Sequence, residues 1–300
     1  MQGLSKHLVV VLALFALGRA TAQVDIVRPN FGVPTKIAPA YFGPNAFPVP
    51  DMLDGRTSSE LRLELYGDCF LGTLTDCVAD DITADLFAKL TIPLFTSKVN
   101  LAVWLPIFEY FNTSSEVNEL RRLHYEGDLQ GFDSGDLYVS TDVRILSQEK
   151  HHIDMTGRAV LKTASANEFD KGRCYDVPGY FFDVAFGRGF KLGTDSTLRV
   201  ALSGGLLCWQ TENGRQNDAA MYGALLAYSY KGLTIDASCG GYIGWERDGD
   251  APMTFKGNMS YRIGNLSLRA GYQVGFRDWP YHQIRVGVAY SFDVLAGLKK

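Results

Sequence analysis

The feature that most constrains this chain is an alternation of apolar and polar residues along unusually long stretches. The clearest case is 284–292, where apolar Ile284, Val286, Val288, Tyr290 and Phe292 alternate with Arg285, Gly287, Ala289 and Ser291. Successive side chains of a β-strand point to opposite faces. Strands of soluble proteins have about five or six residues, whereas a tilted strand that crosses a membrane needs about ten. The pattern therefore predicts strands between an apolar and a polar medium.

The same alternation recurs from Glu60 to the end of the chain. Pro93 and Pro106 weaken the second and third stretches, because proline has no backbone N–H to donate to a neighbouring strand. We predict twelve strands, over 60–67, 83–95, 99–111, 137–146, 151–163, 179–190, 196–209, 218–230, 233–246, 252–263, 266–277 and 281–293.

The predicted connections differ in length on the two sides. Those at 68–82, 112–136 and 164–178 are long, whereas 96–98, 148–150, 193–195, 231–232 and 264–265 are tight turns. Long loops on one side and short periplasmic turns on the other are typical of bacterial outer-membrane barrels. We therefore expect an all-β, transmembrane, antiparallel up-and-down barrel of about twelve strands over 59–293. An even strand number places both ends on the periplasmic side.

The polar faces of these strands are expected to line the lumen. A charged side chain facing lipid at the midplane costs roughly 2–4 kcal/mol, so the apolar faces must lie outside. A soluble β-sandwich would instead bury them. Aromatic residues gather at the strand ends on the apolar faces, as in the interfacial girdles of membrane barrels; they are Tyr228, Tyr230, Tyr261, Tyr290 and Phe292 at one level, with Trp245 and Phe276 at the other.

The N-terminus has the pattern of a secretory signal peptide. Lys6 and His7 precede the apolar run 8–17, and Ala20-Thr21-Ala22 forms a small-x-small cleavage site,. We expect residues 1–22 to be removed. The following segment, 23–58, holds six of the eleven prolines, at positions 29, 34, 39, 44, 48 and 50. It should be extended, either free, at the periplasmic mouth, or inside the barrel. Residues 294–300 are predicted to form a short periplasmic tail.

The last strand carries a family resemblance. Arg285, Gly287, Tyr290 and Phe292 resemble the C-terminal β-signal of bacterial outer-membrane barrels, although this chain continues for eight residues beyond Phe292. In that family the signal is recognised by the barrel-assembly machinery. The wider resemblance covers 59–293 and, with its proline-rich segment, is similar to uncharacterised porin-like barrels of Bacteroidota-type bacteria. It implies the outer membrane of a Gram-negative bacterium and contact with outer-membrane lipid.

The predicted lumen is richly charged. The last three strands carry only bases on their polar faces, and we call these residues the basic wall: Lys256, Arg262, Arg269, Arg277 and Arg285. Unpaired cations along a wet lumen favour anions, so we expect a narrow channel for small, anionic solutes. Acids from the loops or from 23–58 could instead pair with the basic wall. Elsewhere we expect cross-strand ion pairs, as between Asp142/Arg144 and Asp154/Arg158.

Two other classes of function stay open. A structural barrel, or a receptor subunit of an outer-membrane complex, could meet an envelope protein through 23–58 or 112–136. An outer-membrane enzyme is the less favoured class, because the chain has no nucleophile or paired-carboxylate motif with a histidine partner; His124, His151, His152 and His282 are expected to be solvated. We predict no catalytic residue and no cofactor.

The remaining features concern metals, cysteines and nucleic acid. Asp76, Asp80 and Asp81 could hold Ca²⁺, but a solvated acidic loop is the favoured interpretation, so we predict no metal. Cys69 and Cys77 are either bridged or unrelated thiols. The net charge of −4 and the lack of a Lys/Arg-rich run argue against nucleic-acid binding,.

Overall fold

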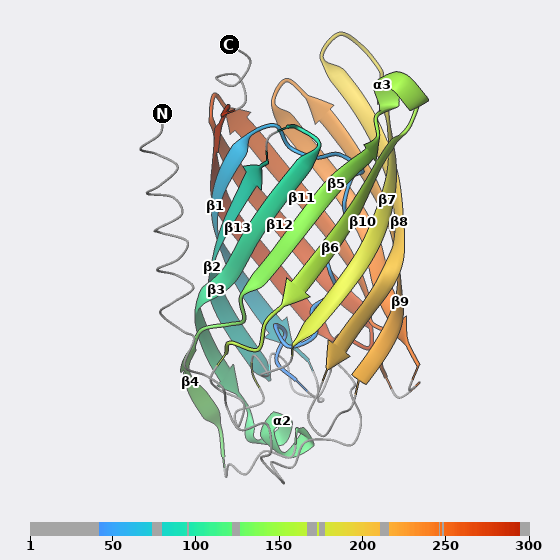
Figure 1. Cartoon of the computed structure of the whole chain (residues 1–300). Helices are drawn as coiled ribbons and strands as arrows, with labels where there is room; N and C mark the ends of the chain where they lie inside the picture. The colour runs from blue at the N-terminus through green and yellow to red at the C-terminus, as the bar shows by residue number, and fades with distance from the viewer. Residues whose placement is uncertain are drawn as a thin grey trace.

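The structure, a computed structural model, describes residues 42–73, 80–94, 96–121, 127–166, 173, 178–210, 216–245, 247 and 249–294. Within this part the chain forms one closed antiparallel barrel (Figure 1). Twelve strands make the wall. They are β1 (Leu61–Gly72), β2 (Asp81–Pro93), β3 (Val99–Thr113), β5 (Tyr138–Leu146), β6 (Asp154–Lys162), β7 (Gly179–Lys191), β8 (Ser196–Gln210), β9 (Gln216–Tyr230), β10 (Leu233–Gly244), β11 (Met253–Ile263), β12 (Leu266–Arg277) and β13 (Tyr281–Phe292).

Each wall strand pairs with the next along the chain, and β13 pairs with β1 to close the barrel. The register of the closing pair places Leu61 opposite Phe292. Long connections lie at one end, here called the loop end, together with α2 (Ser115–Leu120) and the short strand β4 (Leu129–Asp133), which pairs only with β3. Tight turns and α3 (Gln148–His151) lie at the other, the turn end, where β1 begins and β13 ends.

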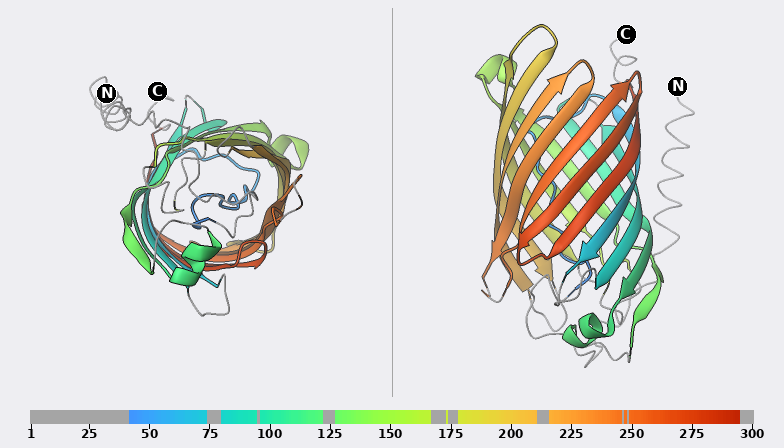
Figure 2. Two further views of the ribbon diagram at one scale, coloured as in Figure 1. Left: turned by 90° about the horizontal axis from the view of Figure 1, so that it is seen from below. Right: turned by 180° about the vertical axis from the view of Figure 1, so that it is seen from behind.

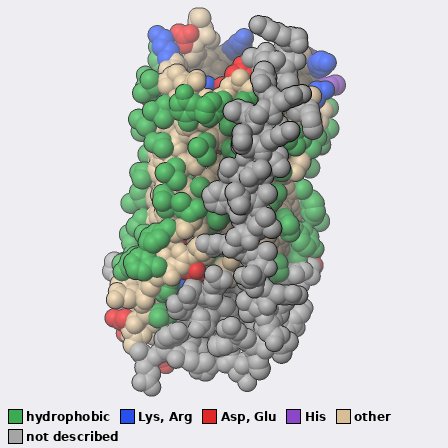
Figure 3. All heavy atoms as spheres, turned by 60° about the vertical axis from the view of Figure 1, so that its left-hand side comes forward, with side chains coloured by type: hydrophobic (Ala, Val, Ile, Leu, Met, Phe, Trp, Pro, Cys, Tyr) green, Lys and Arg blue, Asp and Glu red, His purple; other side chains and the backbone are tan. Residues whose placement is uncertain are grey.

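The outer surface of the barrel is a belt of apolar side chains (Figure 3). Alternate residues of each strand point outward, and Leu206 (63% exposed) and Val286 (59%) stand for many others. Burying this surface in hydrocarbon removes it from water and stabilises the barrel in a membrane. The aromatic residues predicted at the strand ends, such as Tyr290 and Phe292, are exposed on this belt. The described residues contain no helix of the length and apolarity that a membrane span requires.

The fold and the order of the strands confirm the prediction. Every predicted wall strand is present, and β7 to β13 begin and end within two residues of their expected bounds. The first strand was predicted to stop at 67 but continues to Gly72, because the alternation persists with Asp68 and Phe70 inside and Cys69 and Leu71 outside. The helices α2 and α3 and the strand β4 were not predicted; each is six residues or shorter and lies in a connection.

The proline in β3 is accommodated by a bulge. Phe87 of β2 pairs with Pro106 and Leu86 pairs with Phe108, so Ile107 is an extra residue in β3. Before the bulge the even-numbered residues of β3 face the lumen; after it the odd-numbered ones do, including the buried Glu109. A bulge is a usual way to place a proline inside a strand.

Residues 42–58, here called the luminal segment, run along the inside of the barrel (Figure 2, left). At the loop end, the backbone oxygen of Phe42 accepts a hydrogen bond from the hydroxyl of Tyr281, at 2.9 Å. At the turn end, the backbone N–H of Ser58 donates to the side chain of Asn100, at 2.7 Å. Of the three locations expected for 23–58, the described part is therefore inside. The predicted signal peptide, residues 23–41 and most of the tail lie outside the described residues.

Apolar packing holds the loop-end half of the luminal segment. Phe42, Phe47 and Val49 are buried against side chains of the wall, among them Phe181, Trp209 and Tyr242. Phe42 and Phe47, whose rings are stabilised by removal from water, thus pack inside the barrel.

Candidate luminal site

The luminal segment carries the acid that meets the basic wall. The carboxylate of Asp51 lies 2.6 Å from Lys256 Nζ and 3.4 Å from a guanidinium nitrogen of Arg285. Lys256 also donates to the backbone oxygen of Val49, at 3.1 Å, and Arg158 donates to that of Asp51, at 2.9 Å. Three wall cations therefore converge on a short stretch of the luminal segment, from Val49 to Asp51.

The basic wall is paired. The pairs are Lys256 with Asp51 at 2.6 Å, Arg262 with Glu60 at 2.7 Å, Arg269 with Glu64 at 2.5 Å and Arg285 with Asp68 at 2.7 Å. Arg277 is 57% exposed at the loop end and lies 3.8 Å from Asp278. The first four partners come from the luminal segment, from Glu60, which follows it, and from β1. The alternative considered above, in which acids of the loops or of 23–58 pair with the wall, therefore holds for Asp51 and for Asp68 of the predicted loop 68–82, whereas Glu60 and Glu64 belong to the predicted first strand.

The turn-end half of the luminal segment is held through its backbone. Arg199 donates to the backbone oxygen of Asp54 at 2.5 and 2.8 Å, and the Thr156 hydroxyl donates to that of Gly55 at 2.7 Å. A Cβ on Gly187 of β7 would lie 2.1 Å from the Asp54 oxygen. Only glycine therefore allows the wall to approach the segment so closely here.

The other charges of the wall form cross-strand pairs, but not those expected. Arg158 makes a bidentate pair with Asp183 of β7, at 2.8 Å for both contacts, and Arg199 lies 2.9 Å from Asp154. Arg144 bonds the hydroxyl of Ser97 instead of a carboxylate. The expected acids and bases do face the lumen, but the partner of each is decided by strand register and tilt.

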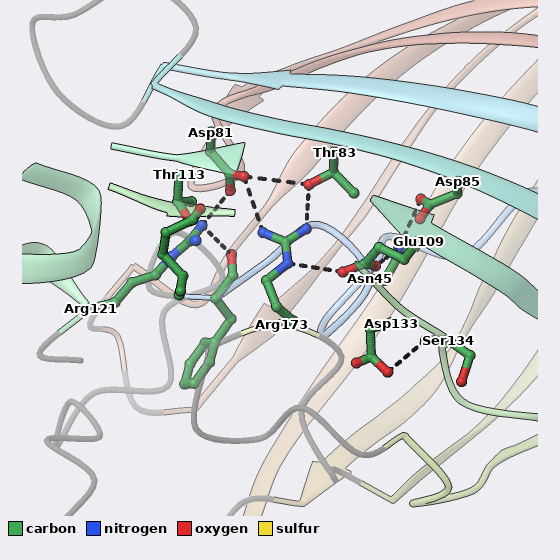
Figure 4. A network of polar contacts seen from close by, with 12 residues as sticks. Asn45, Asp81, Thr83, Asp85, Glu109, Thr113, Arg121, Asp133, Ser134 and Arg173 are labelled. Atoms are coloured by element: carbon green, nitrogen blue, oxygen red, sulfur yellow. Dashed lines mark hydrogen bonds and ion pairs between the residues drawn. The ribbon is translucent and has the colours of Figure 1, made fainter. Parts of the chain in front are cut away.

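A buried ionic cluster, here called the outer network, lies at the loop end of the barrel (Figure 4). Asp81 of β2 lies 2.5 Å from Arg121 and 3.1 Å from Arg173, and Glu109 of β3 lies 2.9 Å from Arg173. All four side chains are fully buried. They bring together two strands, the residue that follows α2, and the loop between β6 and β7.

The outer network also binds the luminal segment. The Asn45 amide donates to Asp85 at 2.9 Å and to Glu109 at 2.7 Å, and Arg121 donates to the Phe42 backbone oxygen at 3.1 Å. Burial alone would lower the pKa of Arg173, but the nearby carboxylates, Glu109 first, outweigh it and raise the pKa above its ordinary value. The guanidinium therefore stays charged throughout the usual pH range, and removing one partner of such a buried pair is costly.

The outer network was missed in the sequence. Asp81 was weighed as part of a solvated acidic loop, but the structure corrects this, because Asp80 and Asp81 are both buried. Glu109 was not recognised as luminal, since the bulge reverses the alternation of β3. Arg173 lies in a long loop without alternation, so no pattern in the sequence indicated that its side chain enters the barrel. Asp76 and Cys77 lie outside the described residues, so the two alternatives for Cys69 and Cys77, a bridge or unrelated thiols, stay open.

The described histidines lie away from the lumen. His151 and His152 are exposed at the α3 turn, as expected. His282 is exposed on β13, where its Nδ1 lies 2.6 Å from the Tyr272 hydroxyl. His124 lies outside the described residues. Among the described residues, none of these three imidazole rings forms a hydrogen bond or an ion pair with a luminal carboxylate.

Two cavities lie beside the luminal segment. The larger, of about 600 Å³, occupies the turn-end half of the lumen and is bounded by residues of 51–56, by β8 to β13, by β1 and β2, and by Arg158 of β6. The smaller, of about 170 Å³, reaches toward the loop end as far as Asn45 and Trp279. They adjoin, because both are lined by Tyr66, Lys89 and Arg285 among others.

The larger cavity presents mainly cations. Eight Arg and Lys residues line it but only four Asp and Glu residues do. Other carboxylates that pair with these cations, Asp68, Asp154 and Asp183, are not among the lining residues. At the Arg269–Glu64 pair the arginine side chain is 46% exposed and the glutamate 8%. At this pair the base lies in front of the acid, whereas Asp51, which is 61% exposed, lies in front of Lys256, which is 13% exposed.

Comparison with known proteins identifies the fold. No family model matches the chain, and no curated protein matches it. Among solved structures, the COG4313 outer membrane channel from Pseudomonas putida F1 matches with a TM-score of 0.53 and 13% identity, over 81% of this chain and 100% of that one. This likeness shows that the chain has the fold of an outer-membrane β-barrel.

Two porins match with lower TM-scores. The KdgM porin in complex with disordered oligogalacturonate gives a TM-score of 0.47 and 14% identity, over 77% of this chain and 99% of that one. The NanC porin gives 0.49 and 10%, over 77% and 100%. The resemblance to Bacteroidota-type barrels stays a prediction.

Proposed function

We propose that this protein is a narrow outer-membrane channel for small solutes, with a preference for anions, and that the luminal segment is its constriction. One observation carries the proposal: two adjoining cavities extend along the luminal segment within a closed barrel. A twelve-stranded barrel is intermediate between the side-chain-filled eight-stranded barrels and the open porins. With the luminal segment inside, the remaining path admits small molecules only.

The preference for anions rests on the excess of cations over carboxylates in the larger cavity. Because eight Arg and Lys residues but only four Asp and Glu residues line it, a solute in the cavity meets a net positive charge. Charged side chains that line a pore select ions of opposite sign. The basic wall contributes through Lys256, Arg269 and Arg285, which line this cavity, whereas Arg262 and Arg277 do not.

Planar-bilayer recording of the purified, folded chain tests the proposal. We expect small conductance steps, and a reversal potential in a salt gradient that shows anion preference. A preference for cations would remove the anion part of the proposal and leave the channel.

The variant Asp51→Asn tests the constriction. It removes the charge that holds Lys256 and Arg285, so we expect larger or more frequent steps than in the unmodified protein. Asp195→Asn is the matched control, since Asp195 is half exposed at the turn end and its one ion pair, to Lys231 at 3.9 Å, lies outside the lumen. If Asp51→Asn and Asp195→Asn conduct alike, the luminal segment is not the constriction.

A non-conducting structural barrel is the second candidate, and the outer network favours it. Fully buried ion pairs of Asp81, Glu109, Arg121 and Arg173 occupy the loop end and narrow any path through it. In that case an envelope partner would meet the described part of 112–136, which includes α2 and β4. No conductance from folded protein, with or without Asp51→Asn, would decide for this candidate.

We further infer that the protein lies in the outer membrane with its turn end in the periplasm. This orientation is supported by the unequal connections, because the short turns of such barrels are periplasmic. Arg285, Gly287, Tyr290 and Phe292 lie in β13, the strand that closes the barrel with β1. That position is consistent with recognition of these residues by an assembly machinery.

A further inference from the structure

Three cations converge on one carboxylate at the edge of the larger cavity. Glu64 of β1 lies 2.9 Å from Arg62 and 2.5 Å from Arg269 of β12. Lys89 of β2 is the residue directly opposite Glu64 in the β1–β2 register. All four residues line the cavity. The group, here called the Glu64 cluster, therefore has two more positive charges than negative ones.

Lys89 is the cation without a carboxylate of its own. Within the described part of the chain its ammonium makes no hydrogen bond and no ion pair, and its ring contact is with Trp104, 5.0 Å from the ring centroid. Lys89 lines both cavities, so it lies where they adjoin. A half-buried ammonium that lacks an anionic partner is a good site for a negative group of a ligand.

The far wall of the same cavity has a different character. Hydroxyl and amide groups line it along β9, β10 and β11, from Ser229, Thr234, Ser238, Asn258 and Ser260. Such groups bind sugar hydroxyls by hydrogen bonds, since each can donate and accept. A ligand between the two walls would therefore meet the cations of the Glu64 cluster on one side and, on the other, mainly neutral polar groups together with Lys256 and with Asp236, to which Asn258 donates.

We propose that this cavity is a binding site for a small polyhydroxylated anion, a sugar acid or a sugar phosphate. Lys89, Arg62 and Arg269 would bind the acidic group, and the β9–β11 wall the hydroxyls. A volume of about 600 Å³ suits a ligand of this size,. The inference deepens the proposed function by giving the channel a solute class, and it is tested by binding, which requires no conduction.

Titration calorimetry on the folded full chain in detergent tests the site, with glucuronate, glucose 6-phosphate, inorganic phosphate and glucose as separate probes. We expect the sugar acid, the sugar phosphate or both to bind more tightly than phosphate or glucose, and binding to weaken as salt rises. Lys89→Gln should raise Kd about tenfold or more, while Lys89→Arg, which keeps the charge, should retain most of the affinity.

Lys231→Gln is the matched control, because Lys231 is exposed at a tight turn away from the cavity. Arg269→Gln is a second cluster variant at a more exposed position, in case Lys89→Gln lowers the folded yield. Equal affinity for glucose and for both anions overturns the role of the cations, and phosphate binding as tightly as glucose 6-phosphate overturns the role of the hydroxyl wall. No binding of either sugar anion to folded protein that conducts would overturn the site and leave the channel.

Discussion

At the scale of single residues, contact between the wall and the luminal segment depends on glycines. A Cβ on Gly187 would lie 2.1 Å from the Asp54 backbone oxygen, and one on Gly223 would lie 1.7 Å from the sulfur of Met52. The two cases differ. Met52 is a flexible side chain that can move aside, whereas the Asp54 oxygen is backbone and Arg199 fixes it.

Gly187→Ala is therefore expected to displace the luminal segment. Overpacking of this kind costs about 1–3 kcal/mol, so the melting temperature of the barrel should fall and its conductance should rise. Thermal unfolding followed by the heat-modifiable gel shift measures the first effect, and bilayer recording the second. Gly257→Ala is the matched control, since a Cβ at Gly257 meets no atom within 4 Å.

Equal melting temperatures for the two alanine variants would contradict this account of the close contact. A lower melting temperature of Gly187→Ala with unchanged conductance would show that the segment stabilises the barrel without limiting flow.

The sequence predicts the face of a charged residue better than its partner. Alternation correctly places Glu64, Arg158 and Lys256 inside, because face depends only on position within a strand. The partner of Lys256 is Asp51, more than two hundred positions away. That pairing depends on how a proline-rich segment crosses the lumen, and no local pattern encodes it.

At the scale of elements, the bulge in β3 lies where the strand changes its pairing partner. β3 pairs with β5 from Val99 to Trp104 and with β4 from Glu109 to Thr113. The extra residue, Ile107, lies between these two stretches. It therefore marks the place where β3 leaves the wall partner and takes the short strand at the loop end.

Deletion of one residue tests which part of this arrangement the fold requires. Without Ile107, Pro106, Phe108 and Glu109 alternate regularly and keep their present faces, so we expect only the loss of stability that comes from placing Pro106 in a strand without a bulge. Deletion of Tyr110 instead reverses the faces beyond it and turns the fully buried Phe111, which packs on Arg173, toward the outside.

Urea titration of both deletion variants in lipid vesicles, monitored by tryptophan fluorescence, measures the difference. We expect loss of Tyr110 to cost at least about 2 kcal/mol, comparable to removing a large core side chain. Similar midpoints for the two deletions would show that the outer network does not depend on the alternation of β3.

The strands were predictable because each shows a local alternation over many residues. The short elements α2, α3 and β4 were not, because six residues or fewer are too few for a periodic pattern. Twelve stretches of alternation gave the wall nearly residue by residue. The bulge interrupts the alternation only once, and a single proline in a strand gives no indication of which neighbour becomes the extra residue. The outer network depends on that bulge and on Arg173 in a loop, so it could not be assembled from the sequence.

At the scale of the whole molecule, the unequal ends imply an orientation. The exposed aromatic side chain of Phe132 lies on β4 at the loop end, and the exposed Lys150 lies on α3 at the turn end. If the turn end is periplasmic, only the first position is accessible from outside the cell.

Single cysteines at these positions test the orientation. In a background with the five native cysteines replaced by alanine, we expect Phe132→Cys to react with a membrane-impermeant maleimide on intact cells. Lys150→Cys should react only after lysis. Labelling of Lys150→Cys alone on intact cells would reverse the proposed orientation, and detection of both proteins in the outer-membrane fraction is the control for their localisation.

The luminal segment competes with any free solute for the cations of the wall. It is joined to β1 within two residues of its last contact at Ser58, so it is never far from the cations that hold it. A tethered group of this kind acts at an effective concentration of about a millimolar or more. To displace the segment from these cations, a free solute would have to be present above that concentration or bind the cations far more tightly than the segment does. In the proposed channel, solutes at micromolar levels would therefore pass beside the segment, and the chain itself rather than the solute would set the width of the path.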